Sequence, residues 1–256
     1  MRYTVNMEIR HIDSPSNDKV KALARLQKKK GRAESGRMLA EGWHLCEEAE
    51  NAGLLETILC TEEARTKYSG NADVIICSQR VLDKLSLQDS GNEIIGVVKI
   101  PQWNITDAKR ALLLDDVQDP GNLGTLVRSA VSFGIDVIYC SAGCADPFNP
   151  KTVQSSQGAI FRIPVVRCDL HATVDELKQH MPVYAAALHR DSIALHDLIS
   201  PADYALMLGN EGQGIHPDLI DACTQTVHIE MDTFESLNVA VAGSILMYCL
   251  RQKMEG

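Results

Sequence analysis

The chain has 256 residues, of which 45% are hydrophobic and 23% charged, and this composition excludes a disordered or collagen-like protein. Its 25 Lys and Arg against 34 Asp and Glu give a net charge of −9, which argues against a uniformly basic nucleic-acid-binding protein. The length suits one large domain or two modest ones.

The charge is distributed unevenly along the chain. Residues 1–106 hold 15 basic and 15 acidic side chains, whereas residues 107–256 hold 10 basic and 19 acidic ones. Residues 19–37 alone contain eight Lys and Arg against a single acid, Glu34. A local basic excess of this kind indicates an interaction surface confined to one part of the chain.

The sequence carries no pattern typical of export or membrane insertion. Residues 1–11 contain no apolar segment followed by a small-residue cleavage site, and the longest apolar stretch, residues 238–250, is too short to cross a bilayer. The eight cysteines form no C-x-x-C pair, and Cys140 with Cys144 is only a weak metal signal. We therefore expect reduced thiols, no metal site and a cytoplasmic protein.

In chain order, the first hundred residues alternate between helical and extended patterns. Apolar spacing predicts one helix over residues 20–26, broken at Gly31, and a second from Arg37 to Ala49 that stops at residues 51–53. This alternation predicts a small α/β domain that ends at a join near residue 104. Its predicted strands lie at residues 57–60, 74–77 and 94–100, and helical segments at residues 62–68 and 79–85 separate them.

Beyond the join, apolar runs without polar alternation are separated by helices, which indicates a parallel sheet covered on both faces. The predicted strands lie at residues 111–114, 136–139, 163–166, 183–187, 204–208 and 226–229, and the predicted helices at residues 122–133, 150–157, 173–179, 217–223 and 236–251. Ligands of such sheets bind at the carboxyl ends of the strands. Three polar loops occupy these positions.

The first loop, residues 116–124, precedes a helix whose apolar stripe excludes Arg128. We expect Pro120-Gly121 to form a turn and Asn122 to cap the helix, so that the long Arg128 side chain can reach back over the helix start. From spacing alone, a capped helix with a solvated arginine is the simpler interpretation of the pattern.

The second loop, residues 208–214, has three glycines in six residues, and the third segment spans residues 235–243. The glycines allow the backbone to approach a ligand, yet the loop is neither G-x-G-x-x-G nor a Walker A sequence. In the third segment Ser236 or Asn238 can cap the following helix. Taken singly, an ordinary turn and a tightly packed helix start remain possible for these segments.

Together, the three loops resemble the SpoU/TrmH family of SPOUT-class RNA methyltransferases. The matching stretches are PGNLGTLVRSAVSFG at 120–134, LGNEGQG at 208–214 and ESLNVAVAGSI at 235–245. Lys151 with SSQGAIFRIP at 155–164 also fits the family. In addition, residues 17–53 resemble the family's small N-terminal RNA substrate-binding domain.

The resemblance implies an α/β fold in two domains: an RNA substrate-binding domain at residues 1–104 and a parallel-sheet domain with a trefoil knot at residues 105–256. It implies a homodimer packed through the knotted domains, with S-adenosylmethionine as methyl donor and a ribose 2′-hydroxyl of structured RNA as acceptor. The implied cofactor-binding residues are Leu208, Gly209, Gly214, Ile229, Met231 and Leu237. The implied catalytic residues are Arg128, Asn122, Glu211, Ser236 and Asn238.

Among the implied catalytic residues, Arg128 would complete a site that includes the other subunit's cofactor, with Asn122 holding its guanidinium. A guanidinium is effectively always protonated, so we expect Arg128 to clamp a phosphate and stabilise a developing alkoxide rather than to act as a base. Glu211 is expected to steer it.

The chain departs from the family pattern in two places. Residues 229–236 lack the usual Pro and Gly and are one residue shorter, and Gln154 stands where many members have Arg. The basic cluster near the N-terminus is expected to contact the RNA backbone. The predicted RNA-binding residues are Lys19, Lys21, Arg25, Lys28, Lys29, Lys30, Arg32, Arg37 and Lys151.

Three alternatives stay open at the level of sequence. The first is the same reaction on transfer RNA, although the N-terminal domain resembles those found with ribosomal-RNA enzymes. The second is methylation of a base, which the combination of Asn122, Arg128 and Ser-Leu-Asn disfavours. The third is a non-catalytic RNA-binding knot protein.

Overall fold

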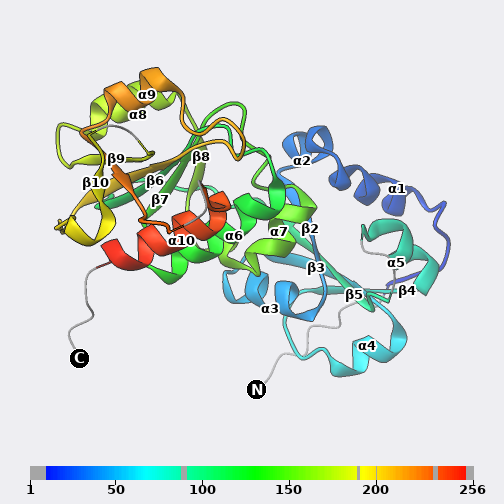
Figure 1. Ribbon diagram of the computed structural model, residues 1–256. Coiled ribbons are helices and arrows are strands. Elements are labelled where there is room, and N and C mark those ends of the chain that lie inside the picture. Colours follow the sequence, from blue (N-terminus) through cyan, green and yellow to red (C-terminus); the bar gives the residue numbers. More distant parts are fainter. Residues whose placement is uncertain (1–9, 88–90, 189–190, 200, 233–235, 252–256) are drawn as a thin grey trace. The chain divides into compact units, whose positions relative to one another are not determined.

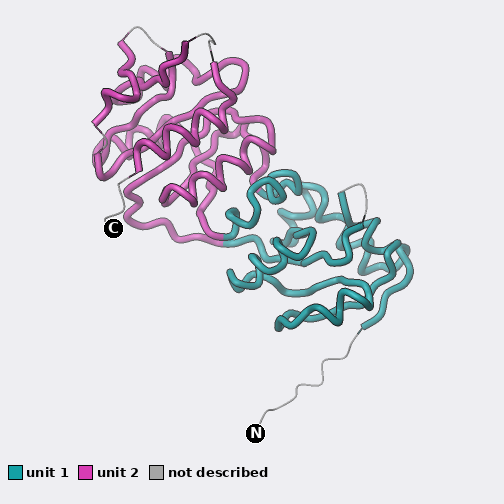
Figure 2. The backbone as a smooth tube through the Cα atoms, turned by 60° about the horizontal axis from the view of Figure 1, so that its bottom comes forward, with its two compact units in different colours: residues 1–101, 148–161 teal, residues 102–147, 162–256 magenta. Residues whose placement is uncertain are grey.

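The computed structural model describes residues 10–87, 91–188, 191–199, 201–232 and 236–251. Residues 233–235, which belong to the shortened loop and the start of the third motif, therefore lie outside the described residues. The chain forms two compact units, residues 1–101 with 148–161 and residues 102–147 with 162–256 (Figure 2). The expected division near residue 104 took no account of segment 148–161, and as a division of function it stays a prediction.

Unit 1 is built on a mixed five-stranded sheet of order β1-β4-β3-β5-β2, in which β5 runs antiparallel to the other four strands. The strands are β1 Arg10–Ile12, β2 Arg37–Glu41, β3 Leu55–Cys60, β4 Asp73–Cys77 and β5 Ile94–Lys99. The helices are α1 Asp18–Ala24, η1 Arg25–Gln27, α2 Lys29–Ser35, α3 Trp43–Asn51, α4 Glu62–Lys67, α5 Gln79–Leu85, α7 Pro150–Ser156 and η2 Ala159–Phe161.

The strands of unit 1 carry apolar side chains on both faces, so both faces are covered by helices. On β3, Leu59 belongs to a core shared with α1, η1 and α5, whereas Ile58 and Cys60 belong to a second core shared with α3 and α4. Successive residues of a strand point to opposite faces, which explains why neighbours on β3 join different cores.

Two predictions for this unit were wrong. The expected helix from Arg37 to Ala49 is a strand followed by a helix, because Gly42 adopts a φ of 92° and separates β2 from α3. The expected break at Gly31 lies inside α2, and the interruption occurs earlier, at the extended residue Lys28.

Unit 2 is built on a seven-stranded, fully parallel sheet of order β10-β12-β9-β11-β6-β7-β8. The strands are β6 Arg110–Leu114, β7 Val137–Cys140, β8 Val165–Arg167, β9 Val183–Ala186, β10 Ile193–Ala194, β11 Tyr204–Leu208 and β12 Gln225–His228. The helices are α6 Pro120–Ser132, α8 Leu170–Leu177, η3 Leu195–Asp197, α9 Pro217–Ala222 and α10 Val239–Leu250.

Helices cover this sheet on both faces, as predicted: α6 and α10 lie side by side on one face, and α8 and α9 on the other (Figure 1). Packing is tight at Gly243 of α10, where an added Cβ would lie 2.5 Å from Leu208 Cδ1 and 2.6 Å from Leu126 Cδ2. The α6–α10 pair therefore holds the starts of two motif helices against the end of β11.

The start of α6 differs from the prediction. Asp119, not Asn122, is the N-cap, and its side chain accepts a 2.9 Å hydrogen bond from the Asn122 N–H. Pro120 is the first helical residue, a position where its missing N–H costs nothing. This arrangement frees the Asn122 side chain for other contacts.

The short strand β10 had no counterpart among the predicted strands, and the trefoil knot stays a prediction. None of the helices in the described ranges combines the length and apolar character needed to cross a membrane.

Candidate active site

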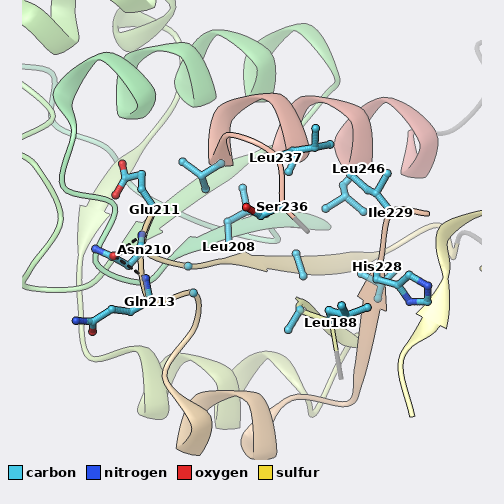
Figure 3. Close-up of a pocket in the computed structure, with 18 of the residues that line it drawn as sticks. Leu188, Leu208, Asn210, Glu211, Gln213, His228, Ile229, Ser236, Leu237 and Leu246 are labelled. Carbon is cyan, nitrogen blue, oxygen red and sulfur yellow. Dashed lines mark hydrogen bonds between the residues drawn. The ribbon is translucent and has the colours of Figure 1, made fainter. Parts of the chain in front are cut away.

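A pocket of about 360 Å³ lies at the carboxyl ends of three adjacent strands of unit 2. Its walls come from the residues that follow β9, β11 and β12 and from the first turns of α10 (Figure 3). This is the edge of a parallel sheet at which ligands bind, because the loops there converge.

The structure brings all six predicted cofactor-binding residues to this pocket, together with Glu211 and Ser236. The other three predicted catalytic residues, Asn122, Arg128 and Asn238, do not line it. Leu188, Gln213 and Leu246 also line it but were not predicted. For Leu188, the sequence signal that could have indicated a pocket position was its place just after the predicted strand at residues 183–187.

The 209–214 loop has a fixed shape that depends on Asn210. The backbones of Asn210 and Gly214 pair through two hydrogen bonds of 2.9 and 3.0 Å, and Gly214 adopts a φ of 74°. Asn210 Oδ1 accepts from the N–H groups of Gly212 and Gln213, and its Nδ2 donates to the carbonyl oxygen of Asp116. The second motif loop is thus tied to the first.

Glu211 receives hydrogen bonds on both carboxylate oxygens. The donors are the N–H groups of Gln118 and Asp119, at 3.3 and 3.2 Å, and Asn122 Nδ2 at 3.0 Å. Asn122 Oδ1 in turn accepts from Asn238 Nδ2 at 3.1 Å. A continuous polar chain therefore joins the loops that carry the three motifs.

These contacts decide the charge of Glu211. Partial burial acts to raise the pKa of Glu211, but the hydrogen bonds from Asn122 and from the N–H groups of Asp119 and Gln118 outweigh it, so the pKa is lowered. A carboxylate held in its ionised form by three donors is a poor proton acceptor. Glu211 is suited to positioning the first loop and Asn122.

Arg128 lies on the exposed side of α6, and among the described residues its guanidinium makes no hydrogen bond or ion pair. The side chains of Asn122 and Glu211 are occupied by each other and by Asn238 and the 118–119 backbone. The predicted contacts of Asn122 and Glu211 with Arg128 are thus not made within the described part of one chain.

The basic cluster of unit 1 is smaller than predicted. Lys19, Arg25, Lys28 and Lys29 are exposed and make no ion pair with any described residue. Lys21 and Lys30 are exposed but pair with Asp18 and Glu34, at 3.0 and 3.8 Å. Lys151, on α7, is also exposed.

For Arg32 the prediction of an RNA contact was wrong. Arg32 is 3% exposed, and its Nη1 donates to the carbonyl oxygen of Leu26 at 2.9 Å, so its side chain stabilises the packing of η1 and α2. Arg37 lies on β2, where its guanidinium donates hydrogen bonds to the Glu56 carboxylate, and this contact raises the pKa of Arg37. Local charge counting could not separate these two arginines from the exposed lysines.

The fold and the pocket define a ligand-binding α/β domain of the doubly covered parallel type. The SpoU rRNA Methylase family matches residues 109–248, and the MRM3-like substrate binding domain matches residues 17–96. The chain belongs to the SpoU rRNA methylase family.

Relatives match over nearly the whole chain. The 23S rRNA (guanosine(2553)-2′-O)-methyltransferase RlmP of Bacillus subtilis is 37% identical over 248 residues, which is 95% of this chain and 100% of that protein. The crystal structure of an RNA 2′-O ribose methyltransferase has a TM-score of 0.81 at 28% identity, covering 94% of this chain and 97% of that one.

The fold also matches an AdoMet-bound rRNA methyltransferase of Sinorhizobium meliloti, with a TM-score of 0.82 at 24% identity, covering 94% of this chain and 97% of that one.

Proposed function

We propose that the protein transfers a methyl group from S-adenosylmethionine to a ribose 2′-hydroxyl of ribosomal RNA. The observation that carries this proposal is that the second and third motif segments line one pocket, while the Glu211–Asn122–Asn238 hydrogen bonds join the first motif to both of them. The 37% identity to the Bacillus subtilis 23S rRNA enzyme over 95% of this chain supports ribosomal RNA as substrate and the 2′-oxygen as acceptor.

The pocket suits S-adenosylmethionine in size and lining. A volume of about 360 Å³ lies within the range of small-molecule sites. Gly209 and Gly214 bring main chain without side chains to the pocket wall, while Leu188, Leu237 and Leu246 offer apolar surface. Leu208, Ile229 and Met231 complete the proposed cofactor-binding set. When bound there, S-adenosylmethionine supplies an electrophilic methyl group on a positively charged sulfur.

The protein's own contribution is positioning and electrostatics. Arg128 carries a permanent charge, so it can bind a phosphate beside the target ribose and stabilise the negative charge that develops on the 2′-oxygen. The lowered pKa of Glu211 makes it unsuitable as the group that takes the hydroxyl proton. Asn122, Asn238 and Ser236 set the shape of the rim around the reacting oxygen.

We propose a homodimer that packs through α6 and α10. Helix α10 is apolar on nearly all sides, yet Val241 and Tyr248 are 48% and 52% exposed. A helix of this composition is normally buried, so a second copy is the covering that suits it. The Arg128 guanidinium on the neighbouring α6, which pairs with none of the described residues, would then be available to the other subunit's site.

The substrate RNA is proposed to bind unit 1 through Lys19, Arg25, Lys28 and Lys29, with Lys21, Lys30, Arg37 and Lys151 nearby in the same unit. The match of residues 17–96 to a substrate-binding domain supports this assignment. Every cysteine lies in the described residues and is free, which agrees with the reducing cytoplasm as the location.

The experiment is methyl transfer from tritium-labelled S-adenosylmethionine to deproteinised ribosomal RNA and, separately, to transfer RNA. We expect label in ribosomal RNA that alkaline hydrolysis releases as a dinucleotide, because a 2′-O-methyl group blocks cleavage at that linkage. Label in mononucleotides would mean base methylation. Label in transfer RNA alone would show that transfer RNA, and not ribosomal RNA, is the substrate. Cofactor binding without any transfer would favour a non-catalytic RNA-binding protein.

A further inference from the structure

Two consecutive aspartates after β6 fasten the 209–214 loop at its start and at its end. The Asp115 N–H donates to the carbonyl oxygen of Leu208 at 2.9 Å, and the Asp116 carbonyl oxygen accepts from Asn210 Nδ2 at 2.9 Å. At the far end, Asp115 Oδ2 accepts from both the N–H and the Nδ1 of His216, each at 2.8 Å. Neither Asp115 nor His216 belongs to the sequence motifs.

The two partners of the Asp115–His216 pair differ in burial. Asp115 is 2% exposed, and an ionised carboxylate at such a position needs donors to replace water. The His216 side chain is 51% exposed, so its ring is not part of the core. The imidazole therefore covers a buried charge from the solvent side and links the end of the pocket loop to the end of β6.

We propose that Asp115 and His216 form a positioning pair that holds the 209–214 loop in the shape required by the methyl donor and keeps Glu211 on its donors. The role of the pair in cofactor binding rests on the proposed function, whereas its role in ordering the loop rests on the contacts alone. Neither residue touches the pocket, so both act through the loop that lines it.

The pair gives the loop a dependence on pH with a defined sign. The Asp115 hydrogen bond, followed by the Asp115 charge, raises the pKa of His216 above its ordinary value of 6.5, and Asp116 after β6 and Asp218 on α9 act in the same direction. From α8, His171 faces this group through its contact with Asp218. The extra stabilisation by protonated His216 is therefore complete below pH 6.5 and is lost as the pH rises through the raised value.

The test compares three full-length variants with the unmodified chain. His216→Ala removes the ring, and His216→Asn keeps a side-chain N–H donor near the position of Nδ1 without a titrating group. His171→Ala is the control, because the His171–Asp218 pair has the same 2.8 Å distance and the same 51% exposure of the histidine, whereas the hydrogen bond and ion pair of the His171 side chain go to Asp218 and not to the loop. The measurements are amide hydrogen exchange of residues 209–214 without ligand, and S-adenosylmethionine affinity by calorimetry between pH 6 and pH 9.

We expect His216→Ala to speed loop exchange and to weaken binding, each about tenfold, the loss typical of a buried charge deprived of a donor. His216→Asn should restore most of the slow loop exchange and most of the affinity for S-adenosylmethionine. Its affinity should no longer fall above pH 6.5. Loop exchange in His216→Ala equal to that in His171→Ala, or no recovery in His216→Asn, would overturn the proposal. A chain that shows the exchange contrast but never binds S-adenosylmethionine would refute the proposed cofactor and leave the positioning pair in place.

Discussion

Asn238 donates a hydrogen bond of 3.1 Å from Nδ2 to Oδ1 of Asn122 and so joins the start of α10 to the first turn of α6, 116 residues earlier in the chain. This contact fixes the orientation of the Asn122 amide, because its Nδ2 must then face Glu211. Through the Asn122 amide, the two asparagines thus link the third motif to Glu211 of the second motif.

Asn122→Asp should harm activity more than Asn122→Ala. An aspartate there would place a second carboxylate against Glu211, and two close carboxylates repel until one is protonated. We expect kcat to fall about 10- to 100-fold at pH 8 and to recover partly as the pH is lowered. Steady-state methyl transfer at saturating cofactor measures this, with Lys178→Ala, at an exposed position outside α6 and α10, as control. Equal losses in Asn122→Asp and Asn122→Ala at every pH would contradict it.

Arg128→Ala should lower kcat without changing cofactor affinity. Removal of one electrostatic stabiliser of a developing oxyanion typically costs about 10²- to 10³-fold in rate. Arg128→Lys should recover only part of the rate, because a point charge lacks the fork of a guanidinium. Single-turnover transfer and calorimetric binding separate the two effects, and near-normal turnover in either variant would remove Arg128 from the mechanism.

If each site combines Arg128 of one subunit with the pocket of the other, two inactive variants should complement each other. Gly209→Ala is chosen to disable the pocket, since an added Cβ would lie 2.2 Å from the Gly214 backbone. Mixing it with Arg128→Ala and allowing exchange should restore about a quarter of the normal activity, because half of the dimers then hold one complete site. No recovery despite demonstrated subunit exchange would mean that each chain builds its own site.

Removal of Lys28 and Lys29 should flatten the salt dependence of RNA binding. Each phosphate contact that is lost reduces the slope of log affinity against log salt by about one. Lys109→Ala with Lys178→Ala removes the same charge from exposed positions of unit 2 and serves as control. Filter binding across a salt series measures both slopes, and identical slopes in the two double variants would take the lysines out of the RNA surface.

Gly243→Ala should destabilise the protein, because its Cβ would press on Leu126 and Leu208. Overpacking of this kind costs about 1–3 kcal/mol, which thermal unfolding detects as a lower Tm. Glu176→Ala, at an exposed position of α8 outside the proposed dimer helices, is the comparison. A Tm unchanged by Gly243→Ala would show that the two leucines can move aside.

The parallel sheet of unit 2 could be predicted from sequence because its strands are buried on both faces and its helices are regularly spaced. Unit 1 was harder, since Leu39, Trp43, Leu45 and Cys46 keep a helical spacing although a strand ends between them. Their true assignment depends on Gly42 and on the pairing of β2 with β5, which are tertiary facts.

Eight of the pocket-lining residues were predicted from the family resemblance of the motifs, whereas the Asp115–His216 pair was not predicted. Loops at strand ends can be found from sequence order, but a contact across 101 residues leaves no periodic signal. Burial of Arg32 is similar, because its partner is the Leu26 carbonyl oxygen and any residue could have supplied that group.

Residues 148–161 belong to unit 1 but are synthesised after the first part of unit 2, and this order affects how unit 1 forms on the ribosome. Strand β2 lies at the edge of its sheet, and α7 packs against it, with Leu39, Leu45 and Val153 lining one cavity. During synthesis, β2 and Leu45 emerge from the ribosome long before α7. Nascent unit 1 therefore passes through a stage in which the apolar side chains of β2 lack the helix α7 that covers them. A fragment ending at Pro101 would remain in that state.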